Sequence, residues 1–169
     1  MKLGYNYIII GGTGQGKSYL TKIMLEKLPK KTKINIWDVN EEYEGNNYKP
    51  PCILGEEDKF LDFIHGMKFC VNVFEEATYF LGHGKNDKRV LNAISRKRHL
   101  NLLNIFLFTS LGTVPVDILR VVDKIFMLNT ADTEHNVRKF KGNHQVWAAY
   151  KASRSAGKLQ YSIAEPNKF

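Results

Sequence analysis

The sequence has no long hydrophobic run. Its longest apolar stretches, such as residues 7–10 and 104–108, are only as long as a β-strand, whereas a membrane-spanning helix needs roughly 20 apolar residues in succession. The amino terminus also lacks the extended apolar region and the small-residue cleavage site of a secretory signal. We therefore expect an intracellular protein without a transmembrane segment.

Cysteine is scarce as well. Cys52 follows two prolines and Cys70 lies within a hydrophobic run, so the two have neither the spacing of metal ligands nor the density of a disulfide-stabilised scaffold. Both are expected to be reduced thiols. Internal repeats and low-complexity tracts are absent too, and together with the apolar content this argues against a disordered chain.

What the chain does contain is an alternation of apolar, β-rich runs with amphipathic segments. Its 169 residues, 43% of them hydrophobic, suffice for one compact domain and leave little room for a second. Most of the expected strands are nearly continuous apolar runs, as in parallel strands that helices cover on both faces. They span residues 5–10, 33–37, 68–74, 104–109 and 124–128.

The segments between these strands have helical periodicity, and the fold class that results is α/β. Residues 17–28 place apolar side chains on one helical face, and further helices are expected at 87–99, 116–122 and 133–140, the last capped by Asp132. Residues 145–150 and 159–163 are interpreted as a C-terminal β-hairpin. The prediction is a single domain over residues 1–169, with a mainly parallel central sheet in a three-layer arrangement.

Positive charge is concentrated in two stretches. The formal net charge is +8, yet residues 81–100 hold six basic residues against one acid, and residues 136–164 hold six with no acid. The rest of the chain is therefore net acidic. A polyanionic partner such as nucleic acid would bind at these two stretches, and a solvated basic surface is the alternative interpretation.

A phosphate-binding motif follows the first expected strand directly. It has the P-loop pattern of glycine, four residues, glycine, lysine and serine, and it reads Gly11, Gly12, Thr13, Gly14, Gln15, Gly16, Lys17 and Ser18. The glycines allow backbone N–H groups to surround phosphate oxygens, while Lys17 adds a charge for the β- and γ-phosphates and Ser18 a hydroxyl for Mg²⁺. Together with Tyr19 in the following helix, this segment is predicted to bind ATP.

Two acids at the end of the third expected strand supply the second half of such a site. Glu75 is assigned to the Mg²⁺ ion and Glu76 to the water molecule that attacks the γ-phosphate in line. Asp is usual at the metal position, so Glu75 is a departure, and its longer side chain would place the metal contact through a water. Acids at a helix start, where they favour the helix dipole, are the alternative.

Three further segments resemble the HerA/FtsK branch of P-loop ATPases. They are the strand end and turn at residues 36–43, the strand end at residues 75–77, and Arg98 with His99 ahead of the strand at 104–109. The resemblance covers residues 4–130. Within that branch, the short chain resembles the genome-packaging ATPases of tailless double-stranded DNA viruses, and it is also similar to the ATPase domain of the zonula occludens toxin-like proteins of filamentous phages.

The resemblance implies an ATP-hydrolysing, Mg²⁺-dependent motor that moves double-stranded DNA without sequence preference. It further implies a homo-oligomeric ring of five or six subunits in the host cytoplasm or the virion, recruited by a capsid vertex or a membrane partner. In such rings an arginine of the neighbouring subunit reaches the γ-phosphate. The matching position is Arg98, with Arg96 in reserve, and a solvated helix face is the alternative.

The predicted DNA contacts rest on position and charge alone. The loop at residues 82–86 follows the hydrolytic strand end and is interpreted as a pore loop, and Arg89 is an alternative contact. The acid-free tail is a third candidate, with Trp147 and Tyr150 packing the fold rather than stacking on bases.

The sequence leaves the γ-phosphate sensor and the role of Asp38 open. The family commonly ends the strand at 104–109 with Thr-Gln, whose glutamine senses the γ-phosphate, and here Thr109 and Ser110 stand instead. Asp38, after the second strand, is either a turn cap or a residue near the nucleotide.

Other functions also stay open. The nearest is a filamentous-phage assembly ATPase, which normally continues into a membrane helix. A nucleoside or metabolite kinase and a nucleotide-gated binding module are the others. The adjacent acids at 75 and 76 favour hydrolysis over transfer to a hydroxyl acceptor.

Overall fold

A six-stranded sheet forms the centre of the molecule in the computed structural model, which describes residues 3–82 and 85–167. Its strands are β1 (Tyr5–Ile10), β2 (Lys33–Trp37), β3 (Cys70–Phe74), β6 (Leu102–Phe108), β7 (Lys124–Met127) and β8 (Ser162–Ala164). They lie in the order β2-β3-β6-β1-β7-β8, all parallel except β8, which runs antiparallel to β7. The expected mainly parallel sheet is confirmed.

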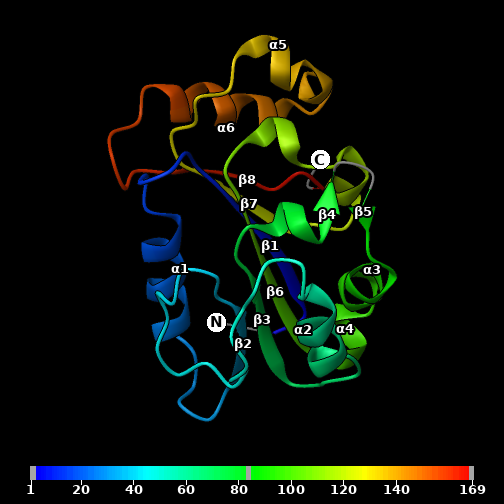
Figure 1. Ribbon diagram of the computed structural model, residues 1–169. Coiled ribbons are helices and arrows are strands. Elements are labelled where there is room, and N and C mark those ends of the chain that lie inside the picture. The colour runs from blue at the N-terminus through cyan, green and yellow to red at the C-terminus, as the bar shows by residue number, and fades with distance from the viewer. Residues whose placement is uncertain (1–2, 83–84, 168–169) are drawn as a thin grey trace.

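Helices cover both faces of this sheet, as Figure 1 shows. On one face α1 (Lys17–Glu26) buries Leu20 and Met24 against the strands. The opposite face is covered by α2 (Glu57–Ile64), α3 (Lys88–Ser95) and α6 (His144–Arg154). The three-layer prediction is therefore confirmed. None of the helices within residues 3–82 and 85–167 is long and apolar enough to cross a bilayer.

Short elements connect these layers. Two helices of one turn are α4 (Lys97–Leu100) and α5 (Glu134–Val137), and the 3₁₀ turns are η1 (Ala77–Tyr79), η2 (Leu111–Thr113), η3 (Val116–Arg120) and η4 (Arg138–Phe140). A separate antiparallel pair consists of β4 (Leu81–Gly82) and β5 (Lys85–Asn86).

Several element boundaries differ from those expected, each for a local reason. The strand expected at 68–74 begins only at Cys70, because Phe69 has a left-handed backbone (φ 55°) that ends strand pairing. The helix expected at 87–99 is capped by the Asp87 side chain and breaks at Arg96 into α3 and α4. The helix expected at 133–140 divides into α5 and η4, and its cap is Thr133 instead of Asp132.

The predicted C-terminal hairpin is wrong in its first half. Residues 145–150 lie within α6, whose buried positions Val146, Ala149, Tyr150 and Ser153 recur with the helical period. Asn143 caps this helix by accepting a hydrogen bond from the Val146 N–H. The second half does end in a strand, β8, which pairs with β7 at the sheet edge.

The helix α2 was not predicted. It buries Phe60, Leu61 and Ile64 against the aromatic side of the core, and two acids, Glu57 and Asp58, stand in its first turn. The acidic start and the apolar i, i+1, i+4 spacing would have indicated it.

A ladder of buried asparagine side chains crosses the sheet. Its members occupy matching register positions in β2, β3, β6 and β1, and they are Asn35, Asn72, Asn104 and Asn6. Each amide donates to the next amide oxygen, at 2.9, 3.1 and 2.9 Å. The last one donates to the carbonyl oxygens of Ile94 and Val121 at 3.1 and 3.0 Å. The ladder therefore links four parallel strands to the end of α3.

The ladder makes a prediction about stability. Asn72→Ala removes the side chain that accepts from Asn35 and donates to Asn104, so it leaves a buried donor and a buried acceptor unpaired. We expect it to lower the free energy of unfolding by about 2–4 kcal/mol. The matched control is Asn92→Ala, at an exposed position of α3, which should change stability little. Urea unfolding of both variants measures this, and equal midpoints would contradict the role of the ladder.

Candidate functional site

The P-loop leaves the sheet at the carboxyl end of β1, between the ends of β6 and β7. The Gly11 N–H donates to the carbonyl of Phe108 at 3.1 Å, and the Gly12 N–H donates to that of Asn129 at 2.9 Å. Gly16 then caps α1 with a left-handed backbone (φ 100°), a conformation that favours glycine. The strand, loop and helix order expected from the motif is therefore present, and the loop is held from both sides.

Lys17 is anchored within the P-loop, and the charges of both predicted acids act on it. Its ammonium donates to the carbonyl oxygens of Gly11 and Gly12 at 2.9 and 3.4 Å. Burial lowers the pKa of Lys17, and the negative charges of Glu76, Glu75 and Glu42 oppose this shift. The fold thus brings together the lysine and the acid pair, which are separated by more than fifty residues of sequence.

Glu75 is a buried carboxylate beside the P-loop serine. Its side chain is 3% exposed, and Oε1 accepts a hydrogen bond from the Ser18 hydroxyl at 3.1 Å. Oε2 is buried and has no hydrogen-bond partner within residues 3–82 and 85–167. Burial raises the pKa of Glu75 to about 7, the charges of Asp38, Glu42 and Glu76 add to this effect, and the Ser18 hydrogen bond opposes it.

This donor set fits a divalent cation. A buried carboxylate oxygen without a partner is costly, and it lies beside a hydroxyl next to the phosphate loop. Hard cations such as Mg²⁺ bind carboxylate and hydroxyl oxygens together with phosphates. Ser18 and Glu75 are therefore suited to hold the ion, as the sequence predicts.

Glu76 has an unusual backbone conformation. Its φ of 53° lies in the left-handed region, which costs an ordinary residue on the order of 1–3 kcal/mol and is concentrated at functional sites. The chain then forms the short 3₁₀ turn η1, with no acid in its first turn. The alternative interpretation of two acids at an α-helix start is not supported by this geometry.

Asp38 organises the loop that faces the acids. Its carboxylate accepts hydrogen bonds from the backbone N–H groups of Glu42 and Tyr43, both at 2.9 Å. It is therefore a turn cap, one of the two roles expected, and its charge also acts on Glu75. Burial, followed by the charge of Glu75, raises the pKa of Tyr43, so this ring also lies beside the site. No sequence signal marked Tyr43 as a neighbour of the P-loop.

The side chain of Ser110 is hydrogen-bonded within the turn that follows β6. Its hydroxyl donates to Asp132 Oδ1 at 2.5 Å, and the Leu111 N–H donates to Oδ2 at 2.7 Å. Asp132, 4% exposed, thus caps the turn after β6 and does not cap α5. Thr109 immediately follows β6, beside the start of the P-loop, so of the two sensor candidates it has the better position.

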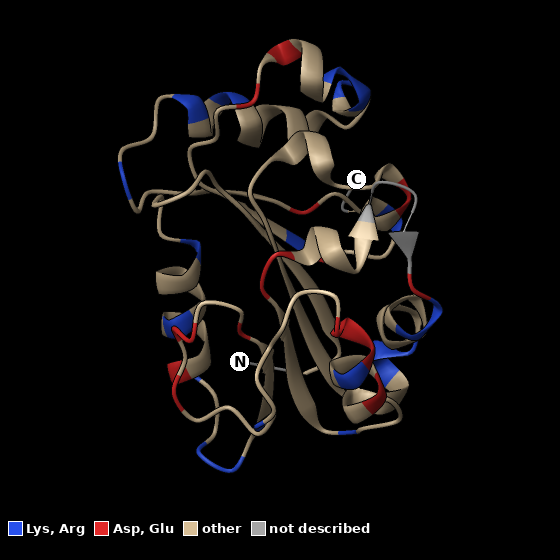
Figure 2. Ribbon diagram, viewed as in Figure 1, with Lys and Arg blue, Asp and Glu red and all other residues tan. Residues whose placement is uncertain are grey.

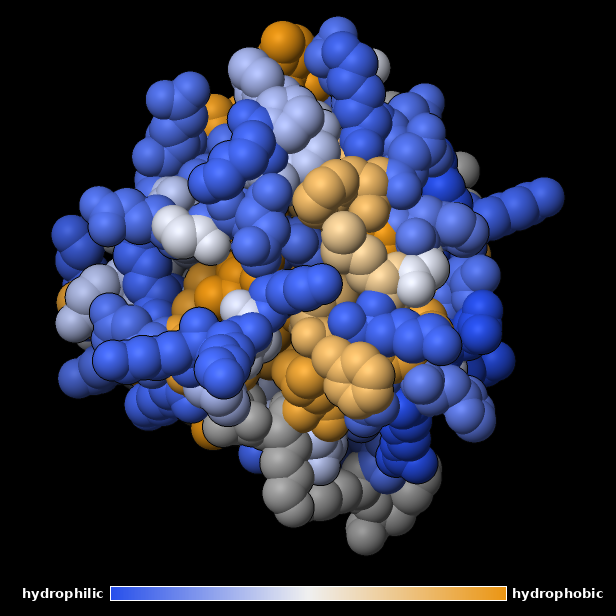
Figure 3. All heavy atoms as spheres, turned by 90° about the horizontal axis from the view of Figure 1, so that it is seen from below, coloured by the Kyte–Doolittle hydropathy of each residue, from blue (hydrophilic) through white to orange (hydrophobic). Residues whose placement is uncertain are grey.

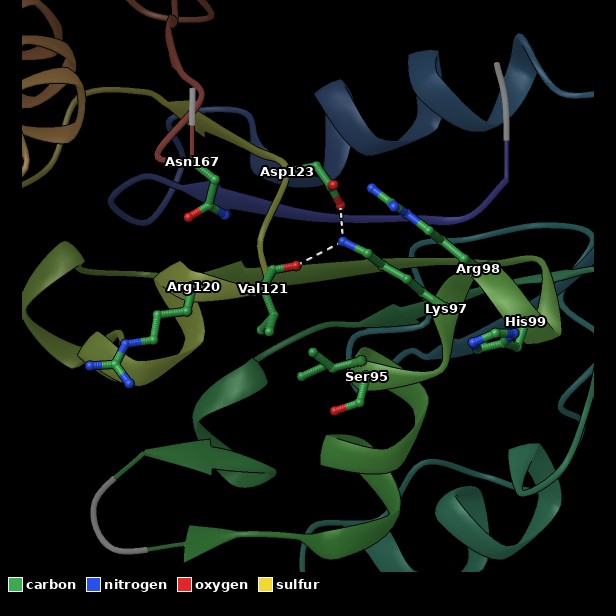
Figure 4. Close-up of a pocket in the computed structure, with 9 residues that line it drawn as sticks. Ser95, Lys97, Arg98, His99, Arg120, Val121, Asp123 and Asn167 are labelled. Atoms are coloured by element: carbon green, nitrogen blue, oxygen red, sulfur yellow. Dashed lines mark hydrogen bonds and ion pairs between the residues drawn. The ribbon is translucent and has the colours of Figure 1, made fainter. Parts of the chain in front are cut away.

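Arg98 lies at the opposite edge of the sheet. It belongs to α4, which precedes the amino end of β6, whereas the P-loop lies at the carboxyl ends. Its side chain lines a pocket of about 370 Å³ together with Lys97, Arg120 and Asp123. In Figure 4, Lys97 is ion-paired with Asp123 and bonded to the Val121 carbonyl, and Arg120 extends away from this pair. Arg98 is exposed, as a residue that acts on another subunit must be.

Arg96, the reserve candidate, lies in different surroundings. It lines a separate small pocket with residues of α2 and α3 and with His65 and Met67. The structure therefore does not bring Arg96 and Arg98 to one place, and Arg120 is the arginine that shares the pocket of Arg98. Nothing in the sequence pattern indicated Arg120.

Part of the basic charge is used within the fold. Arg89 is ion-paired with Asp58, Asp62 and Asp87, which joins α3 to α2. The suggestion that Arg89 contacts DNA is therefore not supported. Figure 2 shows basic residues spread over several elements, α6 and its flanks included. From below, hydrophilic side chains surround a central hydrophobic patch (Figure 3).

The acid-free tail is also partly anchored. The Lys139 ammonium donates to the carbonyl oxygens of Gly112 and Val114 at 2.8 and 2.9 Å, and Arg154 donates to that of Asp132 at 2.7 Å. Tyr150 is 1% exposed, so its predicted packing role is confirmed. In the predicted pore loop, residues 83 and 84 lie outside the described residues, and β4 and β5 flank them.

Viral and bacterial proteins are among the solved structures with a similar fold. One of them is the genome packaging NTPase B204 from Sulfolobus turreted icosahedral virus 2, in complex with ATP-gammaS. Its structure aligns with this chain at a TM-score of 0.76 and 18% sequence identity, and the alignment covers 96% of this chain and 92% of that one. The DNA-packaging ATPase B204 from Sulfolobus turreted icosahedral virus aligns with this chain at a TM-score of 0.68 and 16% sequence identity. This alignment covers 99% of this chain and 100% of that one.

The N-terminal domain of zonular occludens toxin from Neisseria meningitidis aligns with this chain at a TM-score of 0.54 and 12% sequence identity. This alignment covers 76% of this chain and 78% of that one. At these identities the comparisons show a shared fold. A search of curated proteins found no match.

The sequence itself matches a family model. Residues 7–105, from β1 through the acid pair to the middle of β6, match the model described as Helicase HerA, central domain. Because this match extends over more than half of the chain, and the expected HerA-type strand ends are present, the chain belongs to the HerA central-domain family.

Proposed function

We propose that residues 1–169 act as one ATPase domain that binds ATP with Mg²⁺, hydrolyses it and uses the energy to move double-stranded DNA, as in viral genome packaging. The observation that carries this proposal is the contact between the Ser18 hydroxyl and the buried carboxylate of Glu75, and the charges of both acids also act on Lys17. Family membership and the fold shared with packaging ATPases support it.

The residues of the site have complementary roles in this proposal. Backbone N–H groups of residues 11–19 surround the phosphates, and Lys17 neutralises the β- and γ-phosphates. Ser18 and Glu75 would hold Mg²⁺, which supplies charge neutralisation of the phosphates when bound. Glu76 orients the attacking water and accepts its proton, and Thr109 takes the part of the γ-phosphate sensor.

The motor function needs more than one copy of the chain. Arg98 and the P-loop occupy opposite edges of the sheet, so Arg98 can reach a γ-phosphate only when two subunits meet through different surfaces. Such head-to-tail contacts form a ring when the rotation between neighbouring subunits closes, and we propose a ring of five or six subunits around the DNA, recruited by a capsid or membrane partner. The basic residues not used within the fold would contact the DNA backbone.

The first test concerns the water-orienting acid. We expect duplex DNA to stimulate phosphate release by the wild-type protein, and Glu76→Gln to lower turnover about 10²- to 10⁴-fold while ATP still binds. Phosphate release and nucleotide affinity measure the two effects. Glu26→Gln, at the exposed end of α1, is the control and should stay active. Turnover at the wild-type rate by Glu76→Gln would remove this assignment, and phosphate transfer to a nucleoside would favour the kinase alternative.

The second test asks whether Arg98 acts across subunits. Arg98→Ala and Lys17→Ala should each be inactive alone, because each lacks one side of every interface. In an equal mixture, random assembly joins an intact Lys17 to an intact Arg98 at about a quarter of the interfaces, so activity should return to a corresponding fraction. Arg96→Ala in the same mixing series is the control. Absence of recovery at every ratio argues against action in trans.

The third test uses the raised pKa of Glu75. Its folded-state pKa, about 7, exceeds the unperturbed 4.5, so the folded protein retains a proton that the unfolded chain releases. The stability contributed by this group is present below pH 4.5 and lost as the pH rises through 7. We therefore compare melting temperatures without Mg²⁺ between pH 5 and pH 8, a range of ~3 pH units. Over this range the melting temperature of the wild type should fall more steeply than that of Glu75→Gln.

The same proton competes with the metal. Mg²⁺-dependent ATP affinity of the wild type should rise with pH over this range, because the carboxylate ionises, and the Glu75→Gln variant should show no such rise. Calorimetric melting and titration measure both curves. Parallel pH profiles for the two proteins would contradict the placement of the metal at Glu75.

A further inference from the structure

A segment from the far end of the chain packs on the phosphate loop. This strap, residues 155–161, connects α6 to β8, and Figure 1 shows it beside the loop that joins β1 to α1. The Leu159 side chain covers Gly16 so closely that a Cβ placed on Gly16 would lie 2.2 Å from Leu159 Cδ2. A residue more than 140 positions away in sequence is therefore a wall of the P-loop.

The strap lies on a defined flank of the loop. In the sheet order, β3 with its two acids is on one side of β1, and β7 and β8 are on the other. Glu75 contacts Ser18 from the first flank, and Leu159 contacts Gly16 from the second. If the γ-phosphate and the metal lie beside the acids, the nucleoside end of the same ligand projects toward the flank of the strap.

The chemistry of this flank suits a nucleoside. Leu159 and Tyr161 are 46% and 44% exposed, so both present apolar surface to solvent, and Leu159 does so directly beside the P-loop. Tyr161 is held by an edge contact with Phe126, at 5.7 Å between ring centres. Flat, weakly hydrated bases bind to such apolar surfaces by contact and stacking, without reading hydrogen-bonding edges.

The strap is also preorganised and strained. Gly157 N–H donates to Gln160 Oε1 at 3.0 Å and Gln160 N–H donates to the Gly157 carbonyl at 3.1 Å, which forms a tight turn. Arg154 ties the start of the strap to the Asp132 carbonyl. Leu159 itself has a left-handed backbone, with φ of 66°, and strain of this kind persists where the surroundings impose it, often at ligand clamps.

We infer that the strap forms the nucleoside subsite of the proposed nucleotide site, with Leu159 as the residue that contacts the base and ribose. Because the contact is apolar, the subsite takes purine nucleoside triphosphates with little preference between adenine and guanine. The inference rests on the proposed function, since it assumes that the P-loop holds a triphosphate.

The test compares ligands with and without a nucleoside. Affinities for ATP, GTP and inorganic tripolyphosphate, each with Mg²⁺, are measured by calorimetry for the wild type and Leu159→Ala. We expect the variant to bind ATP and GTP about five- to tenfold more weakly, from the lost apolar contact. Its affinity for tripolyphosphate should be unchanged, because that ligand reaches only the P-loop.

Two further variants control for indirect effects. Leu159→Asn keeps a residue that tolerates the left-handed backbone, so it removes the apolar contact without changing the backbone requirement, and it should behave as Leu159→Ala does. Ile163→Ala removes an apolar side chain of similar exposure, 51%, from β8, and it should bind all three ligands as the wild type does. Melting temperatures check that each variant is folded.

The outcomes separate the hypotheses. Equal weakening for ATP and tripolyphosphate would mean that Leu159 only braces the loop, and unchanged binding of every ligand would mean that it contacts none; either result overturns the inference. A loss for ATP but not for GTP would overturn the lack of base preference. If the wild type binds neither tripolyphosphate nor ATP, the proposed function itself fails.

Discussion

The site depends on the alignment of parallel strands, and a ladder of buried asparagines constrains that alignment. Asn35, Asn72, Asn104 and Asn6 share one register line and bond to each other across four strands. A shift of one residue in any strand would move its amide to the opposite face and leave buried groups unpaired. Apolar contacts alone tolerate such shifts better, because a leucine packs in more than one position. The polar ladder therefore specifies a single register.

This register brings the chemical groups of the site to one edge. With β1, β3 and β6 aligned, their carboxyl ends place the P-loop, the acid pair and Thr109 next to each other. Glu75 is then buried against Ser18, where desolvation and neighbouring acids make ionisation costly. A divalent cation would offset that cost. The site without metal therefore favours a protonated Glu75, and the site with metal favours an ionised one. The same burial thus links proton, metal and nucleotide binding.

The C-terminal region completes the site from the other side. Asp132 accepts hydrogen bonds from the turn after β6 through its carboxylate, and its carbonyl accepts from Tyr150 and Arg154 of α6. Through these bonds the end of β6 is joined to α6, and α6 leads into the strap beside Gly16. Many of the basic side chains in this region donate hydrogen bonds to carbonyl oxygens or form ion pairs within the fold. A basic stretch in a sequence is therefore only an upper limit on the charge available to DNA.

The sequence by itself determined the P-loop, the five parallel strands and the acid pair, because each depends on local pattern: glycine spacing, continuous apolar runs, and charges at a strand end. It did not determine α6, because the weak alternation in residues 145–150 favours a strand, or the roles of Asp132 and Arg89. The turn that the Asp132 carboxylate caps lies 20 to 22 residues away, and two of the acids paired with Arg89 are on another helix. Only the tertiary structure decided that Leu159 covers the P-loop and that Arg98 faces away from it, because contacts between distant segments arise from how the strands are ordered in the sheet, and strand order leaves no mark in local sequence.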